Sequence, residues 1–140
     1  ILPKASIGKR PAWNVVYAQH KTRAGLLSAL KQGHSYVSAQ PSLQLEASDG
    51  RGNTWMMGDT ITSSDPITIQ VNWEDVPDGA YIQLKIDGNI QRLEEASTGS
   101  WQDSFDPSTF QWLTLEVWDD AGAWAFTNPL YGTRLAQERN

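Results

Sequence analysis

The chain has 140 residues, a length that suits one folded domain with a single hydrophobic core. Its formal net charge is -5, and its Lys and Arg residues are scattered, so it offers no basic surface for a phosphate backbone and nucleic acid is not expected as a partner. No apolar run approaches the roughly 20 residues that cross a bilayer, so no membrane-spanning segment is expected.

The start of the chain and its cysteine content leave the compartment open. Residues 1–11 lack an initiator Met and an apolar stretch of signal-peptide length, which favours a chain that begins inside a longer polypeptide. The absence of cysteine excludes disulfides and thiolate chemistry, but exported and cytoplasmic proteins can both lack cysteine. An exported and a cytoplasmic location therefore both stay possible.

Residues 1–40 predict a strand, a helix and a second strand. Residues 14–18 form a short apolar, β-branched run, and residues 36–38 resume an extended pattern. Between them, Leu26 and Leu30 lie four residues apart, which is helical spacing. The order of these patterns predicts a strand-helix-strand segment.

The limits of the helix follow from its flanking residues. Thr22 is the expected N-cap, and Gly33 stands where a left-handed residue usually follows a helix. A helix of about eleven residues is marginal alone in water. We therefore expect its leucine stripe to pack either on the domain that follows or on a barrel outside this chain.

Residues 41–140 predict a β-sandwich domain with a C-terminal tail. Ile82, Leu84 and Ile86 alternate with polar residues, so this strand should have one buried and one solvated face. Asp87-Gly88 supplies the positive backbone angles of a tight hairpin turn after it. Further strands are expected at 43–46, 67–73, 90–93, 112–118 and 123–127. This spacing is typical of an immunoglobulin-like antiparallel β-sandwich.

Motifs for catalysis or metal binding are missing. The two histidines, His20 and His34, flank the helix and form no HxH or HExxH pattern, although His20 could line the cleft of a neighbouring domain. Residues 49–53 lack the full ligand set of a calcium loop and predict a hairpin loop instead. No nucleophile elbow or phosphate-binding loop occurs. No catalytic residue, metal ligand or cofactor is therefore predicted in this chain.

Tryptophan is unusually frequent, with seven in the chain. Trp73 continues an apolar strand face and should be internal, whereas Trp112 and Trp118 should share the opposite face of their strand and Trp124 should oppose two alanines. These three rings predict a second surface that contacts either another domain or a ligand such as a sugar. We give interdomain contact the preference.

Seven short motifs, in their order and spacing, resemble the C-terminal part of the polymerase-and-histidinol-phosphatase (PHP) hydrolases of the CehA/McbA type. They are residues 11–18, 22–33, 34–38, 40–43, 57–59, 87–88 and 125–131. The resemblance implies that residues 1–40 are the end of a PHP barrel and residues 41–140 an appended sandwich. It also implies that Asn128-Pro129-Leu130-Tyr131 returns the chain to the barrel.

The resemblance implies a function for the parent protein rather than for this chain. PHP hydrolases resemble a distorted barrel that holds divalent metals and activates water against phosphoesters. The metal-binding motifs of that family have no counterpart here, so this chain is expected to be a non-catalytic accessory portion that packs on the missing barrel and shapes it. The alternatives are a free-standing carbohydrate-binding module and a protein-interaction module of the adhesion type.

Overall fold

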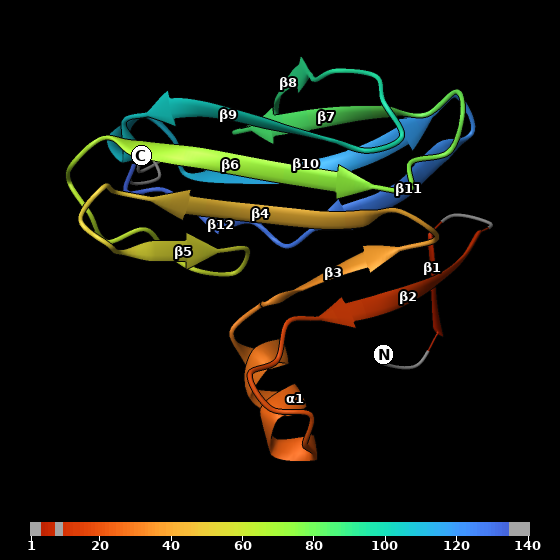
Figure 1. Cartoon of the computed structure of the whole chain (residues 1–140), viewed down its shortest axis with the longest axis horizontal. Helices are drawn as coiled ribbons and strands as arrows, with labels where there is room; N and C mark the ends of the chain where they lie inside the picture. Colours follow the sequence, from red (N-terminus) through yellow and green to blue (C-terminus); the bar gives the residue numbers. More distant parts are fainter. Residues whose placement is uncertain (1–3, 8–9, 135–140) are drawn as a thin grey trace, which may run out of the picture.

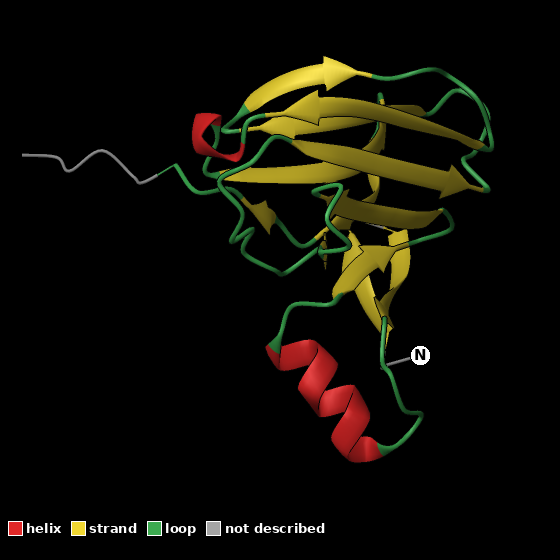
Figure 2. Cartoon of the chain, turned by 60° about the vertical axis from the view of Figure 1, so that its left-hand side comes forward, coloured by secondary structure: helices red, strands yellow, loops and turns green. Residues whose placement is uncertain are grey.

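The computed structural model describes residues 4–7 and 10–134. These residues form a mainly β structure with two antiparallel sheets and one short α-helix (Figure 1). The sheets are arranged like the layers of a sandwich, and the helix projects away from both, as Figure 2 shows from a second direction. The prediction of a mainly β, sandwich-like chain is therefore confirmed.

The larger sheet continues from the sandwich into the N-terminal segment. Its strands are β1 (Lys4–Ile7), β2 (Arg10–Val16), β3 (Ser35–Ser38), β7 (Tyr81–Ile86), β8 (Asn89–Arg92), β10 (Trp112–Asp119), β11 (Gly122–Thr127) and β12 (Leu130–Tyr131). The order is β1-β2-β3-β11-β10-β7-β8, and β12 pairs with β10 outside this path. Because β3 pairs with β11, the predicted strand-helix-strand segment is hydrogen-bonded directly to the sandwich.

The smaller sheet has the order β5-β4-β6-β9. Its strands are β4 (Ser42–Ser48), β5 (Thr54–Met56), β6 (Ile67–Glu74) and β9 (Gly99–Phe105). The predicted loop at residues 49–53 joins β4 to β5, and the Asp49 carboxylate accepts backbone N–H groups of Arg51 and Asn53 there. The pKa of Asp49 is lowered most by the hydrogen bond from the Asn53 side-chain amide. The backbone hydrogen bonds lower it further.

The core lies between the two sheets and is built by period-two alternation. On β4 and β6, the inward residues are almost fully buried while their neighbours are exposed or half-buried. Trp73 is 1% exposed, as expected, and its indole N–H donates to the Ala96 carbonyl at 3.0 Å. The largest buried side chains include Leu43, Leu45, Ile67, Ile69, Ile82, Leu84, Leu113 and Leu115.

One polar residue on a strand face expected to be solvated is buried. Gln83 on β7 is only 5% exposed, and its amide donates to the Glu116 carboxylate at 3.0 Å. Thr114 and the Trp118 indole also donate to Glu116. Alternation correctly places Ile82 and Leu84 inward, but it does not reveal that neighbouring polar side chains cover one another through shared hydrogen bonds.

The tight hairpin between β7 and β8 is confirmed. Asp87 and Gly88 have φ values of 49° and 89°, the left-handed conformation that a two-residue turn needs. The Asp87 carboxylate also accepts the backbone N–H groups of Gln111 and Trp112. The turn is thereby tied to the start of β10.

The single described α-helix, α1 (Arg23–Lys31), has the predicted ends. Thr22 is the N-cap, and its hydroxyl accepts the Gly25 N–H at 3.0 Å. Gly33, with φ 75°, follows the C-terminus. None of the described helices is long and apolar enough to cross a membrane.

Several strands lack a pattern that predicts them. The β9 strand is mostly polar and exposed because it forms an edge of the smaller sheet, and β5 and β12 have only three and two residues. The β1 strand is recognisable only from its pairing with β2. Edge and very short strands bury too few residues to leave a periodic signal.

A substitution at Leu84 tests the core face of β7. Leu84 is fully buried, so Leu84→Ala should lower the free energy of unfolding by about 2 to 5 kcal/mol through lost burial and a new cavity. Urea unfolding measures the change. The control is Leu27→Ala on α1, where the side chain is 49% exposed and the same substitution should have little effect. Equal midpoints for the two variants would contradict the assigned core.

Candidate functional site

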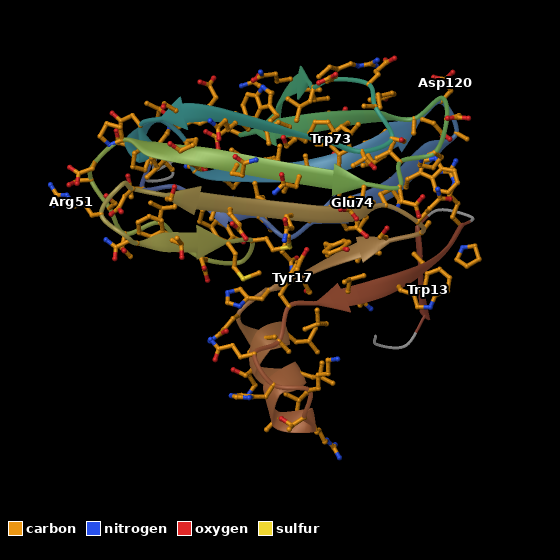
Figure 3. All side chains as sticks on the ribbon, in the orientation of Figure 1. Trp13, Tyr17, Arg51, Trp73, Glu74 and Asp120 are labelled. Atoms are coloured by element: carbon orange, nitrogen blue, oxygen red, sulfur yellow. The ribbon has the colours of Figure 1, made fainter. Side chains whose placement is uncertain are left out.

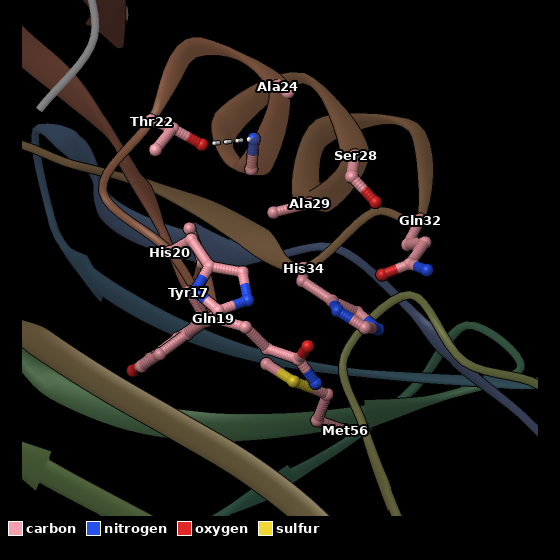
Figure 4. Close-up of a pocket in the computed structure, with 12 residues that line it drawn as sticks. Tyr17, Gln19, His20, Thr22, Ala24, Ser28, Ala29, Gln32, His34 and Met56 are labelled. Atoms are coloured by element: carbon pink, nitrogen blue, oxygen red, sulfur yellow. Dashed lines mark hydrogen bonds between the residues drawn. The ribbon is translucent and has the colours of Figure 1, made fainter.

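A cavity lies beside α1. It encloses about 590 Å³ between residues 17–22, the helix and the residues that follow it (Figure 4). Gln19, His20, Ser28, Gln32 and His34 supply its polar groups. None of the lining side chains carries a carboxylate or a permanent positive charge.

His34 is the most firmly held polar side chain of this cavity. Its Nε2 lies 2.6 Å from the Asp59 Oδ1 atom, while Asp59 Oδ2 accepts the Met56 backbone N–H at 2.8 Å. Asp59 therefore fixes the His34 ring from one side. The other ring nitrogen, Nδ1, makes no hydrogen bond within the described residues.

The second histidine of the sequence, His20, lines the same cavity. Its side chain is exposed and comes from the segment before α1, and the structure thus brings both histidines to one hollow. The backbone of His20 lies close to α1 because residue 25 is glycine. A Cβ at that position would stand 2.3 Å from the His20 carbonyl oxygen. The prediction that His20 lines a cleft of a neighbouring domain stays a prediction.

The end of α1 is held against the sandwich at what we call the helix joint, formed by Gly33, His34, Gly58, Asp59 and Asn128. Gly58 has φ 93°, and a Cβ on it would stand 2.2 Å from the Gln32 carbonyl oxygen. Asn128 donates its amide to the Gly33 carbonyl and to the Ser35 hydroxyl, each at 3.0 Å. Residues far apart in the sequence thus fix the orientation of the helix.

Tyr17 fixes the segment before the helix in the same way. Its hydroxyl donates to the Leu43 carbonyl on β4, and its backbone N–H donates to the His34 carbonyl. Burial raises the pKa of Tyr17 well above its usual value, with Tyr36 and Glu46 adding to the effect. The shift favours the protonated hydroxyl that donates to Leu43.

The cavity has hydrogen-bonding groups but no recognisable catalytic arrangement. No cluster of three or more His, Asp or Glu side chains that could hold a metal occurs within residues 4–7 and 10–134. The His34–Asp59 pair is not hydrogen-bonded to a Ser, Thr or Tyr hydroxyl that it could activate. What the arrangement can do is orient a polar ligand or a neighbouring surface.

Two of the three candidate aromatics, Trp118 and Trp124, pack in different clusters. Trp118 packs with Ala12 and Ala123 in a small second cluster, whereas Trp124 packs against the main core. A β-bulge explains the difference, because the β10–β11 register shifts between Val117 and Trp118 and places one extra residue in β11. Simple alternation along β11 does not anticipate this shift.

Trp118 and Trp112 both make hydrogen bonds inside the chain, Trp118 through its indole N–H and Trp112 through its backbone N–H. The Trp118 indole N–H donates to Glu116 at 2.8 Å, and the half-buried Trp112 donates its backbone N–H to Asp87. Whether Trp112, Trp118 and Trp124 face a domain or a ligand stays a prediction.

Trp124 belongs to a cluster that ties β2 to the β10–β11 turn. The Arg10 guanidinium lies 4.1 Å from the centre of the Trp124 ring and donates to both Asp119 oxygens at 3.0 Å. The Trp124 indole N–H also donates to Asp119, at 2.7 Å. The hydrogen bond from the Trp124 indole is the main cause that lowers the pKa of Asp119, and the hydrogen bond and charge of Arg10 add to it.

Comparisons with protein-family models, with curated proteins and with solved structures find no match to this chain. The resemblance to PHP hydrolases therefore stays a prediction that rests on the sequence motifs. Four of those motifs contribute to the helix joint, at residues 22–33, 34–38, 57–59 and 125–131.

Asp119 predicts a pH dependence of stability. The pKa of Asp119 is lower in the folded than in the unfolded state. Its contribution to the free energy of unfolding is therefore complete above the unfolded-state pKa of about 3.9, and it is lost as the pH falls through the folded-state pKa. Asp119→Asn should therefore lower the urea midpoint at pH 7, and the difference from the unmodified chain should shrink below about pH 4. The control is Asp120→Asn at the exposed neighbouring position. A gap that stays constant down to pH 2.5, or one matched by the control, would contradict this role.

Proposed function

We propose that this chain is a non-catalytic accessory portion of a metal-dependent, phosphoesterase-like hydrolase of the PHP type. It would pack on the catalytic barrel through α1 and shape the cleft beside it. The observation that carries the proposal is an apolar helix surface that the sandwich does not cover. The barrel, its divalent metals and its water chemistry belong to this proposal and not to the residues described here.

The exposed side of α1 supports a docking role. Leu27 and Leu30 are 49% and 37% exposed, and Ala29 is the only buried residue of the helix. A nine-residue helix gains little stability from its own hydrogen bonds, and helices of this kind depend on packing of an apolar face. A second body that covers the leucines would supply that packing.

The segment around the helix is positively charged, which favours a negatively charged partner surface. Residues 18–34 contain Lys21, Arg23 and Lys31 and no acidic residue, although the whole chain has a net charge of -5. A docking surface with acidic residues around an apolar centre would complement this segment.

The helix joint supports the same role because it makes the projecting helix a fixed element. The His34–Asp59 contact and the amide of Asn128 hold the end of α1 to two loops of the sandwich. A rigidly held docking element loses little conformational freedom when it binds.

We also propose that the sandwich is immunoglobulin-like in topology. The orders β4-β6-β9 and β11-β10-β7-β8 are those of a domain in which the first, second and fifth strands form one sheet and the others form the second. The β1 and β2 strands and α1 would then be the part added for docking.

The first test is whether the purified chain binds metal and hydrolyses phosphoesters. We expect neither stoichiometric manganese or zinc nor turnover of p-nitrophenyl phosphate and bis-p-nitrophenyl phosphate, because no group of three metal-ligating side chains was found in the described part of the chain. Elemental analysis and a colorimetric assay measure the two quantities. Stoichiometric metal together with turnover that is lost in His34→Ala would overturn the accessory role.

The second test addresses docking in a polypeptide that also contains the PHP barrel. Leu27→Ser with Leu30→Ser should lower the melting temperature of the barrel and raise KM, because the apolar contact is lost. The isolated chain should keep its urea midpoint with the same two substitutions. Ile90→Ser on β8 is the matched control, since Ile90 is 59% exposed and Figure 1 shows β8 at the opposite end of the molecule from α1. Equal effects of the control and the double variant would contradict docking through α1.

A further inference from the structure

A second hollow lies between the N-terminal strands and the polar face of the smaller sheet. It encloses about 260 Å³. Figure 3 labels Tyr17 on one side of this region and Glu74 at the end of β6 on the other. The larger sheet and the residue after β2 contribute Val15, Tyr17 and Tyr36. The β4 and β6 strands contribute the buried Leu43 and Trp73 and four polar side chains, those of Ser42, Gln44, Asn72 and Glu74.

The aromatic side of this groove is fixed in place. The Tyr17 hydroxyl is bonded to the Leu43 carbonyl, so the ring cannot turn away without losing that bond. The Tyr17 and Tyr36 ring centres lie 5.9 Å apart, and Tyr36 is only 5% exposed. The rings therefore form a preorganised wall rather than mobile surface groups.

The polar side is oriented by a chain of amides. Gln70 donates to the Asn72 oxygen at 3.2 Å, and Asn72 donates to the Gln44 oxygen at 3.1 Å. The Gln44 nitrogen is left as a donor at the end of this chain. Ser42 and Glu74 are paired across β4 and β6, are exposed, and make no side-chain hydrogen bond within the described residues. An amide donor, a hydroxyl that can donate or accept, and an accepting carboxylate thus remain free at the groove.

We propose that this groove binds one ring of a neutral saccharide. A sugar ring has an apolar C–H face and a rim of hydroxyls, which match the aromatic wall and the free polar groups. The Glu74 carboxylate and the absence of a lining Lys or Arg disfavour anions. The volume lies just below the range of about 300 to 1,000 Å³ for typical ligand sites, so it admits a single ring.

This saccharide site is separate from the proposed docking role. It uses β4 and β6, whereas docking uses the exposed leucines of α1. Either proposal can therefore fail while the other stands.

The test is a titration of the isotope-labelled chain with D-glucose, D-mannose, D-galactose and cellotetraose, followed by ¹⁵N–¹H NMR. At least one sugar should shift the side-chain amide of Asn72 and the backbone amides of Ser42 and Glu74 in a saturable way. Gln44→Ala should weaken this binding about tenfold, because a hydrogen bond to the sugar is lost. Glu74→Gln should weaken it as well.

Gln102→Ala is the matched control. It removes the same amide from the same face of the smaller sheet, but on β9 and outside the groove, and should leave the affinity unchanged. The urea midpoint of each variant shows that it remains folded. Shifts that do not saturate with any of the four sugars, or equal losses in Gln44→Ala and Gln102→Ala, would overturn the saccharide site.

Discussion

The close contact between Gly33 and Gly58 determines how the rest of the molecule is arranged. A Cβ on Gly58 would stand within 2.5 Å of backbone atoms of Gly33, so the turn after β5 can meet the end of α1 only because residue 58 is glycine. That approach places Asp59 beside His34, and the Asn128 amide binds Gly33 and Ser35 just after the helix. The helix is consequently a rigid projection from the sandwich rather than a tethered segment.

The two hollows follow from this arrangement. One lies beside the helix because the chain passes from Tyr17 to α1 and returns at His34 on the opposite side of the same space. The other exists because β2 and β3 extend the larger sheet beyond the smaller sheet, so an aromatic surface meets the polar outer face of β4 and β6. Neither hollow belongs to the sandwich core, and both depend on the N-terminal extension.

The tryptophans show how a common residue type takes different roles according to its partners. Trp73 is a core residue, Trp118 covers the buried Glu116, and Trp124 supports Arg10. Each indole N–H has an acceptor in the chain, at Ala96, Glu116 and Asp119 respectively. Internal hydrogen bonding and packing therefore explain part of the high tryptophan content. The number of tryptophans is for this reason weak evidence for sugar binding.

The sequence by itself determined the local structure of this protein. Thr22 and Gly33 set the limits of the helix, Asp87-Gly88 set the hairpin, and period-two alternation identified the central strands, because these signals act between neighbouring residues. Tertiary structure alone decided that β3 joins β11, that a bulge separates Trp118 from Trp124, and that Asp59 meets His34. Those contacts join residues distant in the chain, and their formation depends on which strands pair, for which a single sequence carries no periodic signal.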